Sequence, residues 1–396
     1  MRDTIILAGG YRLDVRNASA IRALGLAHIF LSLGYRVIVM GKFSVAPEGA
    51  RSQGGVLIDG VSCRDIQQPI ADQICASYIK SSEPVMQLVD EAGAERVRAV
   101  LCYNYPARGA WLTIRRTRQL GIAPILDCTE WYGWEGKKIL RNILRVAGVE
   151  MRMRVLTRLA GNVICVSSWF RARIAGSHTM LLPFVLDTDR PEWQRAQAPD
   201  STDPAHLVYS GSPGLGMHKD RLPVMIAALS RLADEGHDFR ISVAGVTEQQ
   251  YLGMVPEHQR EVQALQGRLR FLGRIPHAES LALLRSADFS VFFRKPNRVS
   301  NTGFATKYVE AATLGVPVIS NPTSDIPRYL RDGENGILAR SIAAADVADA
   351  LRRAITMTSE QRAAMVAVCR AENPFDMRLW QHDVHTFLEN LRGCDD

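Results

Sequence analysis

Several features of membrane-spanning and secreted proteins are missing from this sequence of 396 residues. No apolar run is long enough to cross a membrane as a helix, and the first residues lack the layout of a signal peptide. The seven cysteines are scattered and never form a CxxC pair, so neither a disulfide framework nor a zinc knuckle is indicated. We therefore expect a globular protein that remains in the cytoplasm.

Several catalytic patterns are missing as well. The sequence has no serine, histidine and aspartate order of a hydrolase, no histidine cluster for a metal and no Walker loop. The glycine pair Gly9 and Gly10 lacks the full GxGxxG pattern of a dinucleotide site. His382 and His385 have the i, i+3 spacing of a metal pair, but no third ligand accompanies them. We therefore expect chemistry that depends on positioning and charge, with no metal and no cofactor.

The positive charge is unevenly distributed. The net charge is +7, and all of the excess lies within residues 1–190. Much of it falls within residues 131–158, where basic and apolar residues alternate after Trp131, Tyr132 and Trp134. Two interpretations remain open: a basic amphipathic helix that binds an anionic membrane surface, or a packed helix with a solvated basic face. Nucleic acid is not an expected partner, because no aromatic stacking platform accompanies the charge. The basic residues of this segment are Lys137, Lys138, Arg141, Arg145, Arg152, Arg154 and Arg158.

Strand-like and helix-like segments alternate along the chain, which indicates α/β domains with parallel, doubly wound sheets. The first strand is predicted at residues 4–8, followed by a glycine turn and a helix at residues 18–33. The length favours two domains, and a stretch rich in Pro, Asp, Gln and Ala interrupts the alternation. We predict a first domain at residues 1–190, a linker at 191–204, a second domain at 205–373 and a final amphipathic helix at 374–396.

The stretch RKPNRVSNTGFATKYVEAATLGVPVISN, residues 294–321, is where we place the chemistry. A polar, turn-rich run is followed by a helix that opens after Gly303, at the carboxyl end of a predicted strand, where backbone N–H groups and the helix dipole suit a phosphate. Lys307 and Glu310 share one face of this helix. They suit a nucleoside diphosphate, with donors for the phosphates and an acceptor for the ribose, or they form an ordinary i, i+3 ion pair.

The run Gly303-Phe304, then Glu310-Ala311-Ala312, then Gly315-Val316-Pro317-Val318-Ile319, then residues 332–338, DGENGIL, resembles the donor-binding segment of family 4 glycosyltransferases. The resemblance implies a retaining, nucleotide-sugar-dependent enzyme of the GT-B fold. That fold has two facing Rossmann-like domains, with a final helix that returns to the first. It also implies that Glu310 holds the ribose, whereas Thr302 stands where the family has a glutamate that contacts the donor sugar. The motif NTGFATK is similar to the corresponding segment of family members from bacterial polysaccharide assembly.

A second glycine loop, at residues 211–220, follows a predicted strand at residues 206–210 and is also suited to phosphate. The resemblance implies that Lys219 neutralises the donor diphosphate. Ser212 and Pro213 occupy the region where the family usually has an arginine, so Arg294, Lys295 and Lys307 are the cations available to replace it. The predicted donor-binding residues are Gly211, Gly214, Lys219, Arg294, Asn301, Thr302, Gly303, Phe304, Ala305, Lys307 and Glu310.

The first half contributes further candidates. The loop at residues 9–17 opens at the carboxyl end of the first strand and faces the ligand crevice of an open α/β sheet. In the resembled family this loop approaches the donor sugar and acceptor, which makes Gly9, Gly10, Arg16 and Asn17 site candidates. Asp127 and Glu130 follow another strand, where a carboxylate acts as a general base or binds an acceptor hydroxyl. For Asp127, a helix-capping role is the alternative.

The predicted activity is transfer of a sugar from a nucleoside diphosphate to a hydroxyl of a glycan or lipid-linked acceptor in polysaccharide assembly. Lys219, Glu310, Asp127 and Glu130 are the catalytic candidates. Thr129 stands where family members often have a histidine near the reacting sugar. The alternatives are a nucleotide-sugar epimerase of the same fold and a non-catalytic binding or membrane scaffold protein. Turnover of a nucleotide sugar with an acceptor distinguishes these three.

Overall fold

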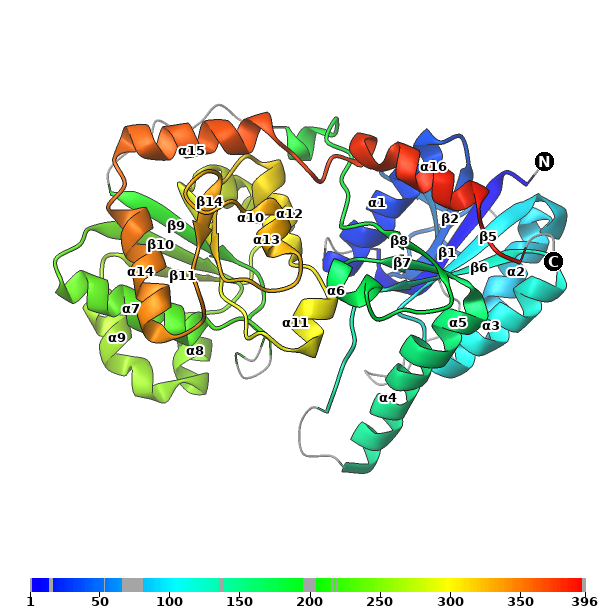
Figure 1. Cartoon of the computed structure of the whole chain (residues 1–396), viewed down its shortest axis with the longest axis horizontal. Coiled ribbons are helices and arrows are strands. Elements are labelled where there is room, and N and C mark those ends of the chain that lie inside the picture. Colours follow the sequence, from blue (N-terminus) through cyan, green and yellow to red (C-terminus); the bar gives the residue numbers. More distant parts are fainter. Residues whose placement is uncertain are drawn as a thin grey trace. The chain divides into compact units, whose positions relative to one another are not determined.

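The computed structural model describes residues 2–13, 17–52, 54–65, 81–134, 139–194, 204–214, 217 and 219–393. The chain forms two compact units. Unit 1 contains Met1–Asp187, Asn301–Phe304 and Asp376–Asp396, and unit 2 contains Thr188–Ser300 and Ala305–Phe375. Most of the predicted linker, at residues 195–203, lies outside the described residues. Figure 1 labels many of the helices and strands of both units.

Unit 1 is built on an eight-stranded sheet with the order β3-β4-β2-β1-β5-β6-β7-β8. All neighbours are parallel except the β3–β4 hairpin at one edge, which the sequence did not predict. Parallel order places the carboxyl ends of the strands at one edge, where open α/β sheets bind ligands. The strands are β1 (Thr4–Arg12), β2 (Arg36–Lys42), β3 (Val56–Ile58), β4 (Val61–Asp65), β5 (Val97–Tyr103), β6 (Ala123–Cys128), β7 (Asn162–Cys165) and β8 (His178–Leu181).

The sheet of unit 1 is buried on both faces. Successive side chains of a strand point to opposite faces, so Ile5 and Leu7 of β1 pack in one core while Ile6 and Ala8 pack in the other. The first core contains α1 and α16, and the second contains α2 and α3 with η3. Each fully buried Leu or Ile contributes about 1.5–3 kcal/mol. The strands are therefore continuously apolar, as expected for parallel sheets.

The helices of unit 1 follow the strands in the alternation that the sequence predicts. They are α1 (Ala18–Ser32), α2 (Glu83–Ala92), η2 (Ala94–Arg96), α3 (Ala107–Gln119), α4 (Ile139–Met151), η3 (Arg152–Leu156), α5 (Thr157–Ala160), α6 (Ser168–Arg171), η7 (Met377–Trp380) and α16 (Gln381–Glu389). The basic segment is thus not one uniform helix: α4 passes into a π-helical turn, η3, before α5.

The prediction that β1 ends in a glycine turn was wrong. Gly9 and Gly10 belong to β1, which continues to Arg12 and pairs with Lys42 after a register shift. A Cβ on Gly9 would lie 2.9 Å from the Tyr11 ring and 3.0 Å from Cβ of Tyr103. The two rings stack with centroids 4.7 Å apart. Glycine is therefore needed at position 9 to admit this aromatic pair rather than to turn the chain.

Unit 2 has a six-stranded parallel sheet with the order β11-β10-β9-β12-β13-β14. Its strands are β9 (Ala205–Ser210), β10 (Phe239–Ala244), β11 (Leu269–Gly273), β12 (Phe289–Val291), β13 (Val318–Ser320) and β14 (Gly336–Leu338). Its helical elements are η4 (Pro191–Trp193), α7 (Leu222–Asp234), α8 (Glu248–Met254), η6 (Pro256–His258), α9 (Gln259–Ala264), α10 (His277–Arg285), α12 (Thr306–Thr313), α13 (Ile326–Tyr329), α14 (Ala344–Ile355) and α15 (Ser359–Ala371). The short helix α11 (Arg298–Thr302) replaces the turn-rich run that the sequence predicted there.

The final segment completes unit 1. Val384, Phe387 and Leu388 of α16 are buried in the same core as β1 and α1. Phe387 stacks on His178 of β8, with ring centroids 4.8 Å apart. The side chain of Asn162 bonds both the backbone N–H and the carbonyl of Arg392. The single helix predicted here is divided into η7 and α16. Among the described residues, no helix is both long and apolar enough to span a membrane.

Candidate functional site

In unit 2, the loops after β9 and β10 approach each other through two glycines. Gly211 has φ of +131° and Gly245 has φ of +115°, a region that glycine occupies without strain. A Cβ on Gly245 would lie 2.2 Å from the carbonyl oxygen of Gly211. A Cβ on Gly211 would lie 3.1 Å from Nζ of Lys307. The missing side chain therefore lets the lysine head reach the carboxyl end of β9.

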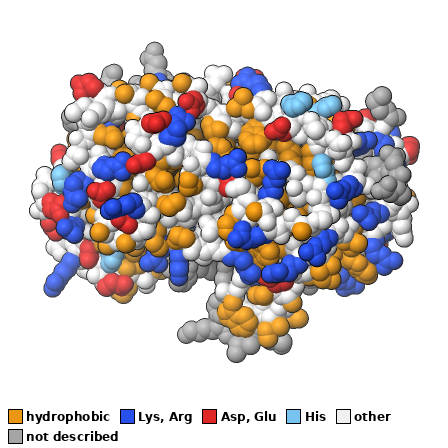
Figure 2. All heavy atoms as spheres, in the orientation of Figure 1, with side chains coloured by type: hydrophobic (Ala, Val, Ile, Leu, Met, Phe, Trp, Pro, Cys, Tyr) orange, Lys and Arg blue, Asp and Glu red, His pale blue; other side chains and the backbone are white. Residues whose placement is uncertain are grey.

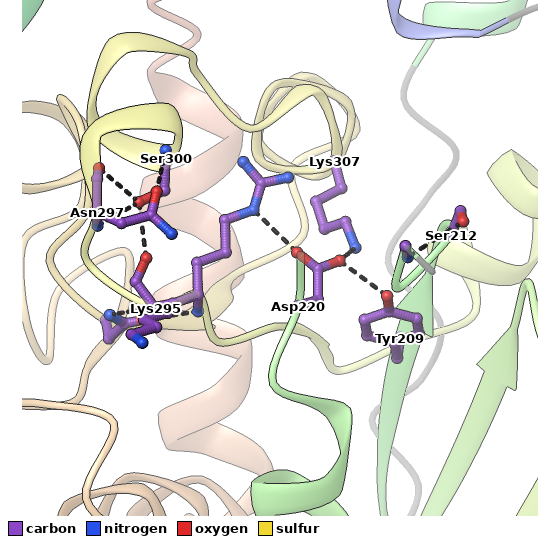
Figure 3. Close-up of polar contacts among 10 residues, drawn as sticks. Tyr209, Ser212, Asp220, Lys295, Asn297, Ser300 and Lys307 are labelled. Carbon is purple, nitrogen blue, oxygen red and sulfur yellow. Dashed lines mark hydrogen bonds and ion pairs between the residues drawn. The ribbon is translucent and has the colours of Figure 1, made fainter. Parts of the chain in front are cut away.

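Asp220, at the end of this glycine loop, is completely buried and uses both carboxylate oxygens (Figure 3). Its Oδ1 accepts a hydrogen bond from Nε of Arg294 at 2.9 Å. Its Oδ2 accepts from Nζ of Lys307 and, at 2.8 Å, from the hydroxyl of Tyr209. We call Tyr209, Asp220, Arg294 and Lys307 the Asp220 cluster. It brings two predicted donor-binding cations together around one carboxylate.

Burial and charge act in opposite directions within the Asp220 cluster. Burial lowers the pKa of Lys307 to about 8, although the adjacent Asp220 opposes the shift. Burial alone would raise the pKa of Asp220, but Lys307 and Arg294 hold that pKa well below its ordinary value. At neutral pH the cluster therefore contains two cations and one carboxylate. Its net positive charge lies at the carboxyl edge of the sheet, beside the glycine loop.

Arg294 is buried, and Asn321 and Asp220 hold its backbone and its side chain in place. Its backbone N–H donates to Oδ1 of Asn321 at 2.8 Å, and its carbonyl accepts from Nδ2 of the same asparagine at 2.9 Å. Only Nε is used by Asp220. Within the described part of the chain, the two terminal nitrogens bind no other side chain or carbonyl. Two parallel N–H groups of this kind match a phosphate.

Lys219 lies in the same loop with an exposed side chain. Its backbone N–H donates to the carbonyl of Pro213 at 3.0 Å. Gly214 has φ of +80°, and a Cβ there would lie 2.9 Å from Cβ of Lys219. This close approach fixes where the lysine leaves the loop. Residues 215, 216 and 218 lie outside the described residues.

The ordinary ion pair between Lys307 and Glu310, left open by the sequence, is not formed. Lys307 pairs with Asp220, whereas Oε1 of Glu310 lies 2.9 Å from Nε2 of His277. Both residues lie on α12, and both are buried. The helix therefore directs a cation and a carboxylate to different partners, as a site with separate subsites requires.

The residues that precede α12 are placed as follows. Thr302 ends α11 and is completely buried, and its carbonyl accepts a hydrogen bond from Oγ of Ser167 at 2.8 Å. The carbonyl of Asn301 accepts from the same hydroxyl at 3.0 Å. Phe304 and Ala305 are buried, and Ala305 is the N-cap of α12. Together with Gly303, these residues form the entry to α12, and their contact with a donor stays a prediction.

The candidates predicted in the loop at residues 9–17 lie in different elements of unit 1 or outside the described residues. Gly9 and Gly10 lie within β1, as described above. Asn17 is the N-cap of α1, where its Oδ1 accepts from the backbone N–H of Ala20 at 3.0 Å. Arg16 lies outside the described residues. The structure thus gives Asn17 a local role in starting α1.

Asp127 has a structural partner that the sequence analysis missed. Its two carboxylate oxygens each accept from Arg22 at 3.0 Å, and both side chains are completely buried. Arg22 also donates to the carbonyls of Leu182 and Pro183. This bidentate pair joins α1 to the ends of β6 and β8. The geometry gives Asp127 neither the exposure of a general base nor the predicted capping role.

Glu130 and Thr129 lie in the loop after β6. The carboxylate of Glu130 is half-buried and accepts from the hydroxyl of Tyr132. Thr129 is buried, and its Oγ1 accepts from Nδ2 of Asn104 at 2.7 Å. Of the two carboxylates predicted in this region, Glu130 is therefore the one with access to solvent.

A match to a family model supports the interpretation of unit 2. Residues 205–357 match the family described as "Glycosyl transferases group 1". A glycogen synthase of Mycobacterium tuberculosis is 29% identical over 197 residues, which cover 49% of this chain and 44% of that protein. A phosphatidyl-myo-inositol mannosyltransferase of Mycobacterium leprae is 30% identical over 130 residues, covering 33% of this chain and 32% of that protein. The chain therefore aligns with less than half the length of these curated relatives.

Solved structures match nearly the whole chain. Sucrose-phosphate synthase from Thermosynechococcus elongatus gives a TM-score of 0.73 at 15% identity, covering 98% of this chain and 99% of that one. Anabaena Alr3699/HepE, solved in complex with UDP and glucose, gives a TM-score of 0.66 at 14% identity, covering 98% and 100%. At such low identity these likenesses concern the fold. They show that the chain has the GT-B fold that its two parallel-sheet units predict.

Proposed function

We propose that this chain, whose residues 205–357 match the model described as "Glycosyl transferases group 1", is a glycosyltransferase that moves a sugar from a nucleoside diphosphate to an acceptor hydroxyl with retention at the anomeric carbon. The observation that carries the proposal is the Asp220 cluster, in which one buried carboxylate holds Arg294 and Lys307 at the carboxyl edge of the sheet. The similar structure of Anabaena Alr3699/HepE was solved in complex with UDP and glucose, which supports a nucleoside diphosphate donor.

The proposed chemistry is stabilisation of a leaving group. When the bond between the anomeric carbon and the diphosphate breaks, its electron pair remains on the phosphate oxygen and the sugar becomes oxocarbenium-like. Fixed cations at the diphosphate lower this barrier because their charge is already in place. The guanidinium of Arg294 and the ammonium groups of Lys307 and Lys219 supply that charge. The acceptor oxygen then bonds to the anomeric carbon on the same face, and its proton passes to the departing phosphate.

Ligand-dependent thermal stability tests the donor site. A ligand that binds only the native state raises stability by about 2.7 kcal/mol at a hundredfold excess over its dissociation constant. We expect a shift with one family of nucleoside diphosphates or their sugars, and we expect Arg294→Lys to reduce it because the two-pronged contact is lost. Arg340→Ala is the matched control, since Arg340 is an exposed arginine of the same unit and pairs with Asp346.

Turnover distinguishes the proposal from its alternatives. A transferase forms a new glycoside from donor and acceptor, an epimerase interconverts nucleotide sugars, and a scaffold does neither. A thermal shift without turnover, over a broad panel of glycan and lipid-linked acceptors, would contradict the transferase. Absence of any shift would contradict the donor site itself.

For the acceptor we propose a lipid-linked or membrane-proximal glycan, reached through an anionic bilayer surface. Figure 2 shows apolar side chains gathered on the lobe at the bottom of the view, where α4 lies in Figure 1, and basic side chains beside them. Leu144 is 69% exposed and Trp134, just before the helix, is 56% exposed. Ile143, Met151 and the η3 residue Val155 are exposed as well. An apolar stripe flanked by arginines suits the boundary between lipid headgroups and acyl chains.

The contacts in this segment divide its residues into two groups. Trp131 is buried, and Arg152 is buried with its guanidinium bound to the carbonyls of Asn104, Tyr105 and Glu130. These two residues support the fold, as in the packed-helix interpretation that the sequence left open. Arg154 and Arg158 remain exposed. Lys137 and Lys138 lie outside the described residues, as does the side chain of Arg141.

Vesicle sedimentation tests the membrane surface. We expect the wild type to sediment with vesicles of phosphatidylcholine and phosphatidylglycerol, and the double variant Ile143→Glu, Leu144→Glu to lose most of this binding because two inserted apolar side chains become anionic. Leu57→Glu is the control, because Leu57 of β3 is 75% exposed elsewhere in unit 1. Equal sedimentation of all three proteins would contradict membrane binding through α4 and favour a packed helix with a solvated basic face.

A further inference from the structure

Glu310 has one carboxylate oxygen in use and one open. Oε1 lies 2.9 Å from Nε2 of His277, and the Glu310 side chain keeps 11% of its surface exposed. For Oε2, the structure records no hydrogen-bond partner among the residues it describes. A carboxylate that is mostly removed from water needs hydrogen bonds to offset its desolvation. The open oxygen can therefore accept a hydrogen bond from a ligand at little further cost.

His277 reaches Glu310 from a fixed position in the fold. It is the first residue of α10, directly after the N-cap Pro276 and four residues beyond the end of β11. Trp193 of η4 packs against its ring edge-on, with centroids 6.1 Å apart and planes at 68°. The imidazole is thus held by a helix start on one side and by a buried indole on the other.

The chemistry of the contact assigns the proton. A carboxylate only accepts hydrogen bonds, so Nε2 of His277 carries the hydrogen and donates it to Oε1. Nε2 donates in the neutral tautomer and in the imidazolium alike, so the contact persists when the ring is protonated. The histidine therefore acts as a permanent donor to one oxygen. Because both oxygens belong to one planar carboxylate, holding Oε1 also fixes the direction of Oε2.

We infer that His277 is a positioning residue for the nucleoside ribose, which holds Oε1 of Glu310 so that Oε2 is presented to the ribose hydroxyls of the bound nucleoside diphosphate. The inference rests on the proposed donor site and adds a residue to it. Without the histidine the carboxylate loses its fixed rotamer, and the hydrogen bond to the ribose must order it on binding. The contribution of His277 to affinity therefore depends on the presence of ribose hydroxyls.

Binding of matched nucleotides to the full chain tests this dependence. Calorimetry with UDP, ADP and GDP identifies the base that binds, and the 2′,3′-dideoxy form of that nucleotide supplies a ligand without the hydroxyls. We expect His277→Ala to weaken binding of the ribose form about tenfold, the value of one charge-assisted hydrogen bond. Its affinity for the dideoxy form should equal that of the wild type.

Two further variants separate positioning from folding. His277→Gln keeps an N–H donor near the position of Nε2 and should restore most of the affinity for the ribose form. His258→Gln is the control, because His258 of η6 also makes a side-chain hydrogen bond in unit 2, at 2.7 Å to the hydroxyl of Tyr251, without touching Glu310. In a Glu310→Ala background, His277→Ala should have no further effect.

Two results would overturn the inference while leaving the donor site intact. One is equal weakening of the ribose and dideoxy forms by His277→Ala, which would mean a general structural role. The other is unchanged affinity for both forms. Failure of the wild type to bind any of the three nucleotides would instead overturn the proposed function, and the inference with it.

Discussion

Lys307 is a buried lysine whose pKa is set by its burial and by the neighbouring Asp220. Its ammonium lies over the ring of Tyr209, 4.1 Å from the centroid, and bonds Asp220. Burial removes water from the charged form and lowers its pKa to about 8, while Asp220 limits the loss. The residue therefore titrates near physiological pH. An anion bound beside it would return the pKa toward its ordinary value.

This titration predicts a pH dependence of donor binding. Below pH 8 Lys307 is protonated before and after binding. Its titration should therefore not make the affinity for a nucleoside diphosphate depend on pH in this range. Above pH 8 the free protein has lost the proton and must take it up on binding, so affinity should fall by up to about tenfold per pH unit. Calorimetry at pH 9 in two buffers of different ionisation enthalpy should report uptake of a proton, whereas at pH 7 it should not.

Lys307→Met is the control for that titration. The variant should bind more weakly at pH 7 and lose the dependence on pH above 8. Proton uptake that persists in this variant would assign the titration to another group, and equal affinity of the wild type at pH 7 and pH 9 would contradict the placement of Lys307 at the phosphates.

At the residue scale, spacing along one helix was enough to select Lys307 and Glu310, but not to find their partners. Asp220 is 87 residues from Lys307, and His277 is 33 residues from Glu310. Arg22, the partner of Asp127, is 105 residues away. No local pattern marks an aspartate at a loop end or a histidine at a helix start as a partner of a distant charge. Only the order of strands in the sheets brings them together.

Among the elements, α16 packs in the core of unit 1 although it follows unit 2 along the chain. Its residue Phe387 is buried against His178 of β8 and lies in the core of unit 1. Phe387→Ala should cost about 3–5 kcal/mol of unfolding free energy, because it removes a buried ring and leaves a cavity. Chemical denaturation should show unit 1 unfolding at lower denaturant than in the wild type, because the lost ring belongs to the core of unit 1.

Leu379→Ala tests the specificity of that effect. Leu379 lies in η7, only eight residues from Phe387 along the chain, but it is 66% exposed. Its truncation should change the unfolding free energy by no more than about 0.5 kcal/mol. Comparable losses in the two variants would mean that the segment is stabilised by its helical structure rather than by the buried ring.

The sequence predicted most strands of both sheets, because parallel strands buried on both faces are short apolar runs bounded by turn residues. It failed where tertiary contacts override local signals. The Tyr11–Tyr103 stack keeps Gly9 and Gly10 in β1, and the buried carbonyl contacts of Arg152 accompany a π-helical turn that interrupts the predicted basic helix. The β3–β4 hairpin, with its three-residue edge strand, gave no periodic signal.

At the scale of the whole molecule, the two sheets and the final helix follow from alternation and length, and the resemblance in residues 303–338 predicted the GT-B fold. The ligand classes followed less directly. Helix starts and glycine loops indicate a phosphate site, which stays a prediction. The identity of the base, the sugar and the acceptor could not be predicted, because their recognition depends on side chains from separate loops whose positions the sequence does not encode locally.

The discontinuity of unit 1 also has a consequence for biosynthesis. Its sheet is finished by Asp187, yet Val384, Phe387 and Leu388 of its core follow only after Asp376, once all of unit 2 has been translated. At roughly 5–20 residues per second, the ribosome takes roughly 10–40 s to make the intervening chain. During that interval the core that β1 and α1 form lacks the apolar side chains of α16. We therefore expect unit 1 to reach its full stability only after unit 2 has been made.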